Sequence, residues 1–171
     1  MTVAEFERLP DDGNHHELDE GDLIVMPPTG LRHGRVMRLV ARALDRYAMQ
    51  TGSGEVLLDC GFRLAADTVQ APDVAFIRDD RRTKVTERIG DFAPDLAVEI
   101  LSPSDNAGRL QRKIGHYFAA GTSAVWVLDP ESKTVSVYER SGAFRALNAD
   151  DLIDAPDLLP DFSAAVRTLF E

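Results

Sequence analysis

DLAVEIL at 95–101, followed by SPSDNAG at 102–108, is the stretch that decides the expected fold. A short apolar run of this kind predicts a strand buried on both faces near the centre of a sheet. The polar segment after it ends the strand and leads into a helix expected over 107–120, and Gly121 suits the C′ position that closes such a helix. Glu99 does not fit this pattern, because a carboxylate in a buried strand is costly unless it is paired, hydrogen-bonded or bound to a cation.

The segments around this strand and helix predict further strands and a second long helix. AVWVL at 124–128 is typical of another buried strand, and apolar residues at steps of three and four predict an amphipathic helix from about 30 to 52. The other expected elements are a short helix at 2–9, a hairpin within 15–26, strands at 55–59, 62–65, 73–77, 134–138 and 144–147, a loop at 78–90, and a helical turn around 163–170. This order predicts an α/β (α+β) fold with a mixed central β-sheet flanked by helices.

Length and composition indicate a single domain over residues 1–171. A chain of 171 residues that is 44% hydrophobic and 28% charged can bury a sizeable core without cross-links. The single cysteine, Cys60, excludes an intramolecular disulfide and a cysteine-rich zinc site. The sequence has neither a signal-peptide pattern nor an apolar run of membrane-spanning length, so we expect a cytoplasmic protein without a membrane partner.

The net charge of −10 weakens any nucleic-acid hypothesis, because proteins normally meet polyanions with basic surfaces. Carboxylates that bind cations would make part of this negative charge functional. One basic group could face a phosphate backbone or form a solvated loop, and the sequence leaves both open: Arg78, Arg81, Arg82 and Lys84. A second group lies on the outer face of the 30–52 helix and is more typical of solvated surface: Arg35, Arg38, Arg42 and Arg46, with Asp45 among them.

Three acidic residues stand in strand contexts that do not call for charge. Glu99 interrupts the apolar strand, Asp73 opens a strand directly after Pro72, and Glu17 lies in the first strand of the hairpin. Each of them alone could simply pair with an arginine or cap a backbone amide. Together they resemble the ligand set of a hard cation such as Mg²⁺, which prefers carboxylate oxygens. Lys113, on the helix after the Glu99 strand, is the candidate amine that would orient water or offset charge beside such an ion.

An ordered set of segments gives the sequence a family resemblance. The segments are HELDEGDLIVMPP, RHG, APDVAFI, PDLAVEILSPSD, RKIGHYFAAGTSAVWVLDP and VSVY, from about Glu17 to the last helix. In this order they resemble the restriction-endonuclease-like family of the PD-(D/E)XK nuclease superfamily, formerly described as a domain of unknown function. The resemblance implies a restriction-endonuclease-like core with a mixed central sheet.

The resemblance also implies roles for particular residues. Asp73 matches the motif aspartate, Glu99 matches the (D/E) position, and Glu17 matches the upstream acidic residue, so these three are the implied metal ligands. The standard lysine position, two residues after Glu99, holds Leu101 here. Lys113 matches the branches in which the lysine has migrated to the next helix. Arg109 is a second departure, because related sequences often carry an acidic residue there.

Several other polar residues have less specific interpretations. His33 could line the site and contact substrate, or it could cap a helix or lie on the surface. His15 and His16 are adjacent and would point to opposite faces of a strand, so they are poor partners for one metal ion. Tyr117 is interpreted as a packing residue. The sequence contains neither a zinc-ligand spacing nor a G-x-S-x-G nucleophile elbow.

These observations favour a Mg²⁺- or Mn²⁺-dependent endonuclease that hydrolyses DNA, with Glu17, Asp73, Glu99 and Lys113 as catalytic residues. A homodimer is expected, because many enzymes of this fold cut both strands as dimers. The first alternative is a catalytically weak nuclease-fold module for binding or assembly, which the negative charge and the displaced lysine favour. The second alternative is hydrolysis of a small nucleotide, which an acidic protein would reach more easily than long DNA.

Overall fold

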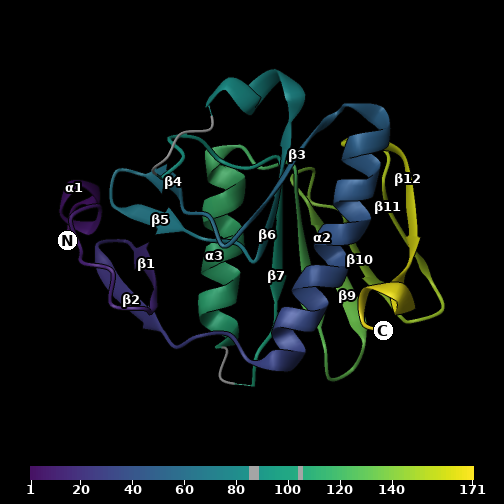
Figure 1. The fold of residues 1–171 in the computed structure, drawn as a ribbon, viewed down its shortest axis with the longest axis horizontal. Coiled ribbons are helices and arrows are strands. Elements are labelled where there is room, and N and C mark those ends of the chain that lie inside the picture. The colour runs from purple at the N-terminus through teal and green to yellow at the C-terminus, as the bar shows by residue number, and fades with distance from the viewer. Residues whose placement is uncertain (85–88, 104–105) are drawn as a thin grey trace.

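Two α-helices lie on opposite faces of a mixed six-stranded sheet (Figure 1). The computed structural model describes residues 1–84, 89–103 and 106–171. The sheet has the order β10-β9-β8-β7-β6-β3, and only β7 and β8 among these neighbours run parallel. Its strands are β3 (Gly54–Leu58), β6 (Val74–Arg78), β7 (Leu96–Ile100), β8 (Ala124–Asp129), β9 (Thr134–Glu139) and β10 (Phe144–Leu147).

The central strand β7 is buried on both faces, as its apolar sequence predicts. Val98 and its alternate neighbours pack into the core that contains α2 (Leu31–Thr51). Ala97 lies on the other face and packs into the core that contains α3 (Ala107–Ala120). Because side chains alternate along a strand, Glu99 lies on the same face as Ala97 and is directed toward α3.

The two long helices begin and end where the sequence predicts. The side chain of Asn106 caps α3 by accepting hydrogen bonds from the backbone amides of Gly108 and Arg109. Gly121 ends α3 and Gly52 ends α2, both in the left-handed conformation that glycine adopts without steric cost.

Smaller elements flank the central sheet (Figure 1). A four-stranded sheet has the order β2-β1-β5-β4, and two further strands, β11 and β12, pair with each other. Their bounds are β1 (His15–Asp19), β2 (Asp22–Met26), β4 (Phe62–Ala65), β5 (Thr68–Gln70), β11 (Leu152–Ala155) and β12 (Leu159–Ala165). The short helices are α1 (Val3–Phe6) and the 3-10 helices η1 (Asp79–Lys84) and η2 (Val166–Leu169).

The structure confirms most of the expected elements and corrects a few. The N-terminal helix is four residues long instead of eight. The segment expected as a loop at 78–90 contains the 3-10 helix η1, and residues 85–88 of that segment lie outside the described residues. Three strands were not expected, namely β5, β11 and β12. The turn near the C-terminus is a 3-10 helix that follows β12. Among the described residues, no helix is both long enough and apolar enough to cross a membrane.

Candidate active site

The register between β6 and β7 brings Asp73 and Glu99 together. Val74 pairs with Val98 and Ala75 with Ala97 in this antiparallel ladder. Extending the same register by one residue places Asp73, directly before β6, opposite Glu99. Side chains opposite each other on one face of an antiparallel pair are neighbours, with Cβ atoms about 4.5–5.5 Å apart in ordinary ladders. Two carboxylates distant in sequence therefore meet at one end of the sheet.

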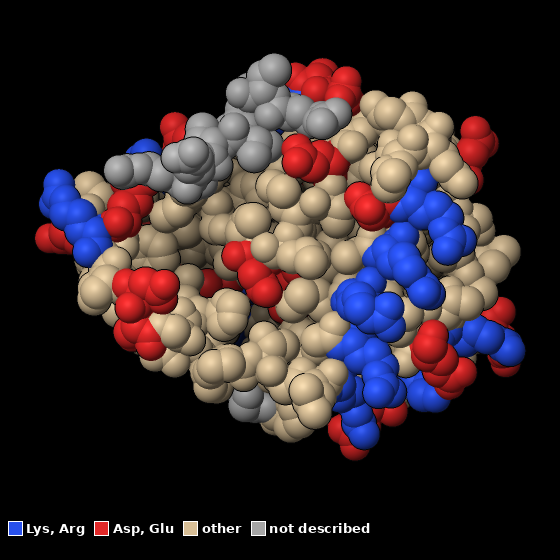
Figure 2. All heavy atoms as spheres, in the orientation of Figure 1, with Lys and Arg blue, Asp and Glu red and all other residues tan. Residues whose placement is uncertain are grey.

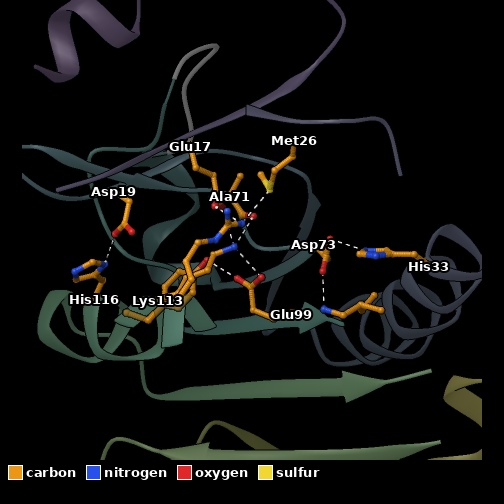
Figure 3. Close-up of polar contacts among 12 residues, drawn as sticks. Glu17, Asp19, Met26, His33, Ala71, Asp73, Glu99, Lys113 and His116 are labelled. Atoms are coloured by element: carbon orange, nitrogen blue, oxygen red, sulfur yellow. Dashed lines mark hydrogen bonds and ion pairs between the residues drawn. The ribbon is translucent and has the colours of Figure 1, made fainter. Parts of the chain in front are cut away.

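Two contacts hold the carboxylate of Asp73 (Figure 3). Its Oδ2 accepts a hydrogen bond of 2.6 Å from the backbone amide of Ile100, the last residue of β7. Its Oδ1 lies 2.7 Å from Nε2 of His33, which belongs to the first turn of α2. Of the two interpretations of His33 left open by the sequence, the structure therefore supports the one that places it at the site.

Lys113 reaches from α3 into the space between two carboxylates (Figure 3). Its Nζ lies 2.7 Å from Oε1 of Glu17 and 2.8 Å from Oε2 of Glu99. All three residues are buried, with exposures of 7%, 1% and 8% respectively. Oε1 of Glu17 also accepts a hydrogen bond of 2.9 Å from the amide of Ala71, which fixes this side chain beside the ammonium.

Tyr117 belongs to the site, which corrects its interpretation as a packing residue alone. Its ring is fully buried, and its hydroxyl donates a hydrogen bond of 2.8 Å to Oε1 of Glu99. Tyr117 follows Lys113 by four residues, so both side chains project from the same face of α3. That spacing, with a hydroxyl that needs a partner when buried, was the signal available in the sequence.

Burial and charge shift the ionisation of this cluster. Burial raises the pKa of Glu99 most strongly, Lys113 lowers it, and the negative charges of Asp73 and Glu17 raise it further, to about 8. Burial lowers the pKa of Lys113, but the two glutamates outweigh burial and raise it above its ordinary value. Burial and the charge of Glu99 raise the pKa of the Tyr117 hydroxyl well above its usual range, so it remains a donor.

Asp59 and Arg109 extend the charge pattern of the site. Asp59 follows β3 on the rim, and its pKa is raised by partial burial and by the negative charge of Asp73. Its backbone amide donates a hydrogen bond of 3.3 Å to the carbonyl of Asp73. Nη2 of Arg109 lies 3.9 Å from Oε2 of Glu17, so this departure from the family pattern adds positive charge beside that acid. No pattern in the sequence singles out Asp59, because it approaches Asp73 only through the pairing of β3 with β6.

The donor set fits a divalent cation between Asp73 and Glu99. Each carboxylate oxygen offers two lone-pair directions, so an oxygen that accepts one hydrogen bond retains capacity for a metal ion. Burial, and then the negative charges of Asp73 and Glu17, raise the pKa of Glu99 and so disfavour its charged form, and a cation bound here would favour that form. Within the described residues, however, no three His, Cys, Asp or Glu side chains come together closely enough to hold one ion. Glu17 instead faces Lys113.

The basic group near η1 is partly engaged with acids of the same chain. Arg78 lies 3.3 Å from Asp80, and Arg81 lies 2.9 Å from Asp95 and also bonds the carbonyl of Ala93. These contacts engage both arginines within the chain, which disfavours a phosphate backbone as their partner. The side chains of Arg82 and Lys84 lie outside what the structure describes.

The family comparison covers nearly the whole chain. Residues 3–167 match the family model described as "Uma2: Putative restriction endonuclease". The chain belongs to the Uma2 family. This assignment confirms the family resemblance drawn from the ordered segments, and the Uma2 match includes Glu17, Asp73, Glu99 and Lys113.

A solved structure shares the Uma2 chain's fold. It is a crystal structure from Anabaena variabilis ATCC 29413 described as "a putative nuclease belonging to DUF820". The two chains are 23% identical and superpose with a TM-score of 0.87, over 99% of this chain and 97% of the other. The likeness confirms the predicted mixed sheet flanked by helices. No curated protein is similar enough in sequence to count as a match.

Proposed function

We propose that the chain is a metal-dependent endonuclease that hydrolyses phosphodiester bonds of DNA. The observation that carries this proposal is the convergence of Asp73, Glu99 and Lys113 at one end of the central sheet. Asp73 directly precedes β6, Glu99 belongs to β7 and Lys113 belongs to α3. Membership of the Uma2 family supports a nuclease activity in general. DNA as the substrate and a divalent cation as the cofactor go beyond what family membership supports and are part of the proposal.

Asp73 and Glu99 would hold the cation, which we propose is Mg²⁺ or Mn²⁺. A bound ion of this kind supplies a water of lowered pKa and polarises the phosphoryl oxygen. The sequence predicted Glu17 as a third ligand, whereas its contacts with Lys113 and the Ala71 amide suit it to positioning the lysine. His33 would fix the orientation of Asp73 through its 2.7 Å contact.

Lys113 would act as a fixed positive charge and hydrogen-bond donor. Its raised pKa keeps the amine protonated at neutral pH, so it cannot accept a proton from water. A protonated amine can orient a water molecule and stabilise the negative charge that develops on the phosphoryl oxygens. Leu101 occupies the standard position of the motif lysine, and Nζ of Lys113 provides the ammonium from α3 instead.

Nicking of supercoiled plasmid in the presence of Mn²⁺ tests the proposal. We expect wild-type protein to nick the plasmid and Asp73→Asn to do so at least about 100-fold more slowly, because it loses one charged ligand. Asn retains an oxygen that can accept the hydrogen bond from the Ile100 amide, so the fold should survive. Equal rates for wild type and Asp73→Asn would refute the assignment of Asp73.

A matched control separates the site from a general effect of charge. Asp157 is exposed in the turn between β11 and β12, far along the chain from the site. Asp157→Asn makes the same chemical change and should nick at the wild-type rate. Circular dichroism and thermal melts of all three proteins would establish that they are folded.

A second candidate function is a nuclease-fold module that binds or assembles without cleaving. It is favoured by the finding that the described residues contain no group of three possible metal ligands. Calorimetry with Mg²⁺ and with Mn²⁺ distinguishes the two, because the proposed enzyme must bind one of these cations. Binding that is present in wild type and lost in Asp73→Asn favours the enzyme.

The homodimer expected by analogy with other enzymes of this fold remains a proposal. Two sites related by a twofold axis would allow both strands of a duplex to be cut. Light scattering coupled to gel filtration gives the mass directly: a dimer of the 18.8 kDa chain is expected, and a monomeric mass would contradict it.

A further inference from the structure

Five arginines form a row along the exposed face of α2. They occur at steps of three and four residues, and residues at these steps lie on one face of a helix. The opposite face is buried in the main core. We call them the arginine row, and all five are exposed: Arg32, Arg35, Arg38, Arg42 and Arg46.

The arginine row is a positive surface on a negative protein. The chain has a net charge of −10, yet Asp45 is the only acidic residue in α2. Among the described residues, no carboxylate forms a salt bridge with any member of the row. Five arginines outside α2 do pair with an acid of the chain: Arg63, Arg78, Arg81, Arg112 and Arg145. Its positive charge is therefore available to an outside partner.

The row begins at the candidate active site. His33, which contacts Asp73, lies in the first turn of α2 next to Arg32. Figure 2 shows a continuous blue band along the course of α2 in Figure 1, on the same face as a recess in which red carboxylate groups are visible. A molecule bound to this row would therefore extend toward the proposed catalytic acids.

We propose that the arginine row binds the phosphate backbone of double-stranded DNA and leads it to the candidate active site. This inference rests on the proposed function and specifies its substrate class. Arginine suits the role because its planar guanidinium stays charged and forms paired hydrogen bonds with phosphate oxygens.

The length of the row favours a polymer over a small nucleotide. From Arg32 to Arg46 the helix rises about 21 Å, at 1.5 Å per residue. One strand of a duplex carries a phosphate about every 3.4 Å along its axis, so the row spans about six phosphates. A single nucleotide could contact only one or two members, which leaves the rest of the row unexplained.

Duplex binding measured without hydrolysis tests the inference. The probe is a fluorescent duplex of about 20 base pairs, longer than the row, titrated by anisotropy with EDTA present over a series of salt concentrations. The test variant is Arg42→Gln/Arg46→Gln, which changes the end of the row distant from Asp73 and keeps good helix formers. The control is Arg8→Gln/Arg140→Gln, which removes the same charge from two exposed arginines outside α2.

We expect the test variant to bind the duplex at least about tenfold more weakly and to lower the salt slope by about 2, because each arginine replaced would neutralise one phosphate. The control should match wild type. Failure of wild type to bind the duplex, or equal slopes for test and control variants, would overturn the inference. A lower mass of the test variant in light scattering, with unchanged duplex binding, would also overturn it and identify the row as a self-association surface.

These outcomes are independent of catalysis. If wild type binds the duplex through the row but never nicks plasmid with Mn²⁺, the proposed function fails and the inference stands. If it nicks plasmid and the test variant binds as wild type does, the inference alone fails.

Discussion

The ammonium of Lys113 lies 2.8 Å from Oε2 of Glu99, and both side chains are buried. Glu17 completes the arrangement on the other side of the same ammonium. Removing one partner of a buried ion pair leaves a charge without compensation, which costs more than the pair contributes when intact. A substitution at Lys113 should therefore affect both the proposed chemistry and the stability of the fold.

Lys113→Met should lower the free energy of unfolding by about 3–5 kcal/mol, because Glu17 would remain buried without the ammonium and Glu99 would lose a hydrogen-bond donor. Methionine retains most of the length and apolar volume of lysine. Urea denaturation followed by circular dichroism measures the change.

Lys133→Met is the matched control for this substitution. It makes the same chemical change, and Lys133 pairs with Glu171 at the surface, where both side chains are exposed. Exposed pairs contribute little, so a loss below about 1 kcal/mol is expected. A comparable loss in both variants would contradict the importance of the buried cluster.

Tyr117→Phe should weaken binding of Mn²⁺ by about 10–100-fold, because partners that orient a metal ligand have effects of this size. The variant removes only the hydroxyl that donates to Oε1 of Glu99. Calorimetry with Mn²⁺ measures the affinity.

Tyr47→Phe serves as its control. The Tyr47 hydroxyl donates to the carbonyl of Pro160 at 3.0 Å, in the core on the other face of the sheet. Both substitutions should reduce stability by about 1 kcal/mol, whereas only Tyr117→Phe should alter Mn²⁺ affinity. Unchanged affinity in Tyr117→Phe would remove the tyrosine from the site.

The main elements were predictable because their sequence signals are local. The apolar run at β7 and the three- and four-residue spacing of α2 indicate the buried strand and the helix directly, and Gly121 and Asn106 mark the ends of α3. The strands β11 and β12 were missed because Pro156 and Pro160 interrupt a segment rich in aspartate. That hairpin pairs only with itself and packs on the core, which no local pattern indicates.

The site residues were predictable by type, whereas their contacts depend on register. Glu99 stands out in the sequence because it is charged within an apolar strand, but its position opposite Asp73 follows from the β6–β7 ladder. The contact of Glu17 with Lys113 requires the hairpin β1–β2 to lie directly against α3. Such pairings join residues distant in sequence, so neither periodicity nor spacing determines them.

The raised pKa of Glu99 predicts a specific dependence of stability on pH. Its folded pKa of about 8 exceeds the ordinary value of 4.5, so the native state holds a proton that the unfolded state releases. The contribution of this group is therefore complete at acidic pH and is lost as pH rises through about 8. Without divalent cations, the unfolding free energy of wild type should fall between about pH 5 and pH 8 relative to Glu99→Gln, by at most about 1.4 kcal/mol per pH unit.

Urea titrations of wild type and Glu99→Gln in EDTA, at a series of pH values, measure this difference. The contribution of Lys113 is constant over this range, because its raised pKa keeps it charged in the native state and its ordinary value does so in the unfolded state. Parallel curves would show that Glu99 is ionised in the native state at neutral pH.

Gly54→Ala should destabilise the protein by about 1–3 kcal/mol, the usual cost of forcing atoms into a packed core. A Cβ at Gly54 would clash with the carbonyl oxygen of Ile77 and with the ring of Phe76, so β3 would have to move away from β6. Gly115→Ala makes the same chemical change on the exposed side of α3, where a Cβ meets nothing within 4 Å. That variant should instead gain up to about 1 kcal/mol, because alanine favours a helix over glycine. Thermal melts should show a lower melting temperature for Gly54→Ala and an unchanged or higher one for Gly115→Ala. An unchanged melting temperature for Gly54→Ala would mean that β3 can shift away from β6 without loss of stability.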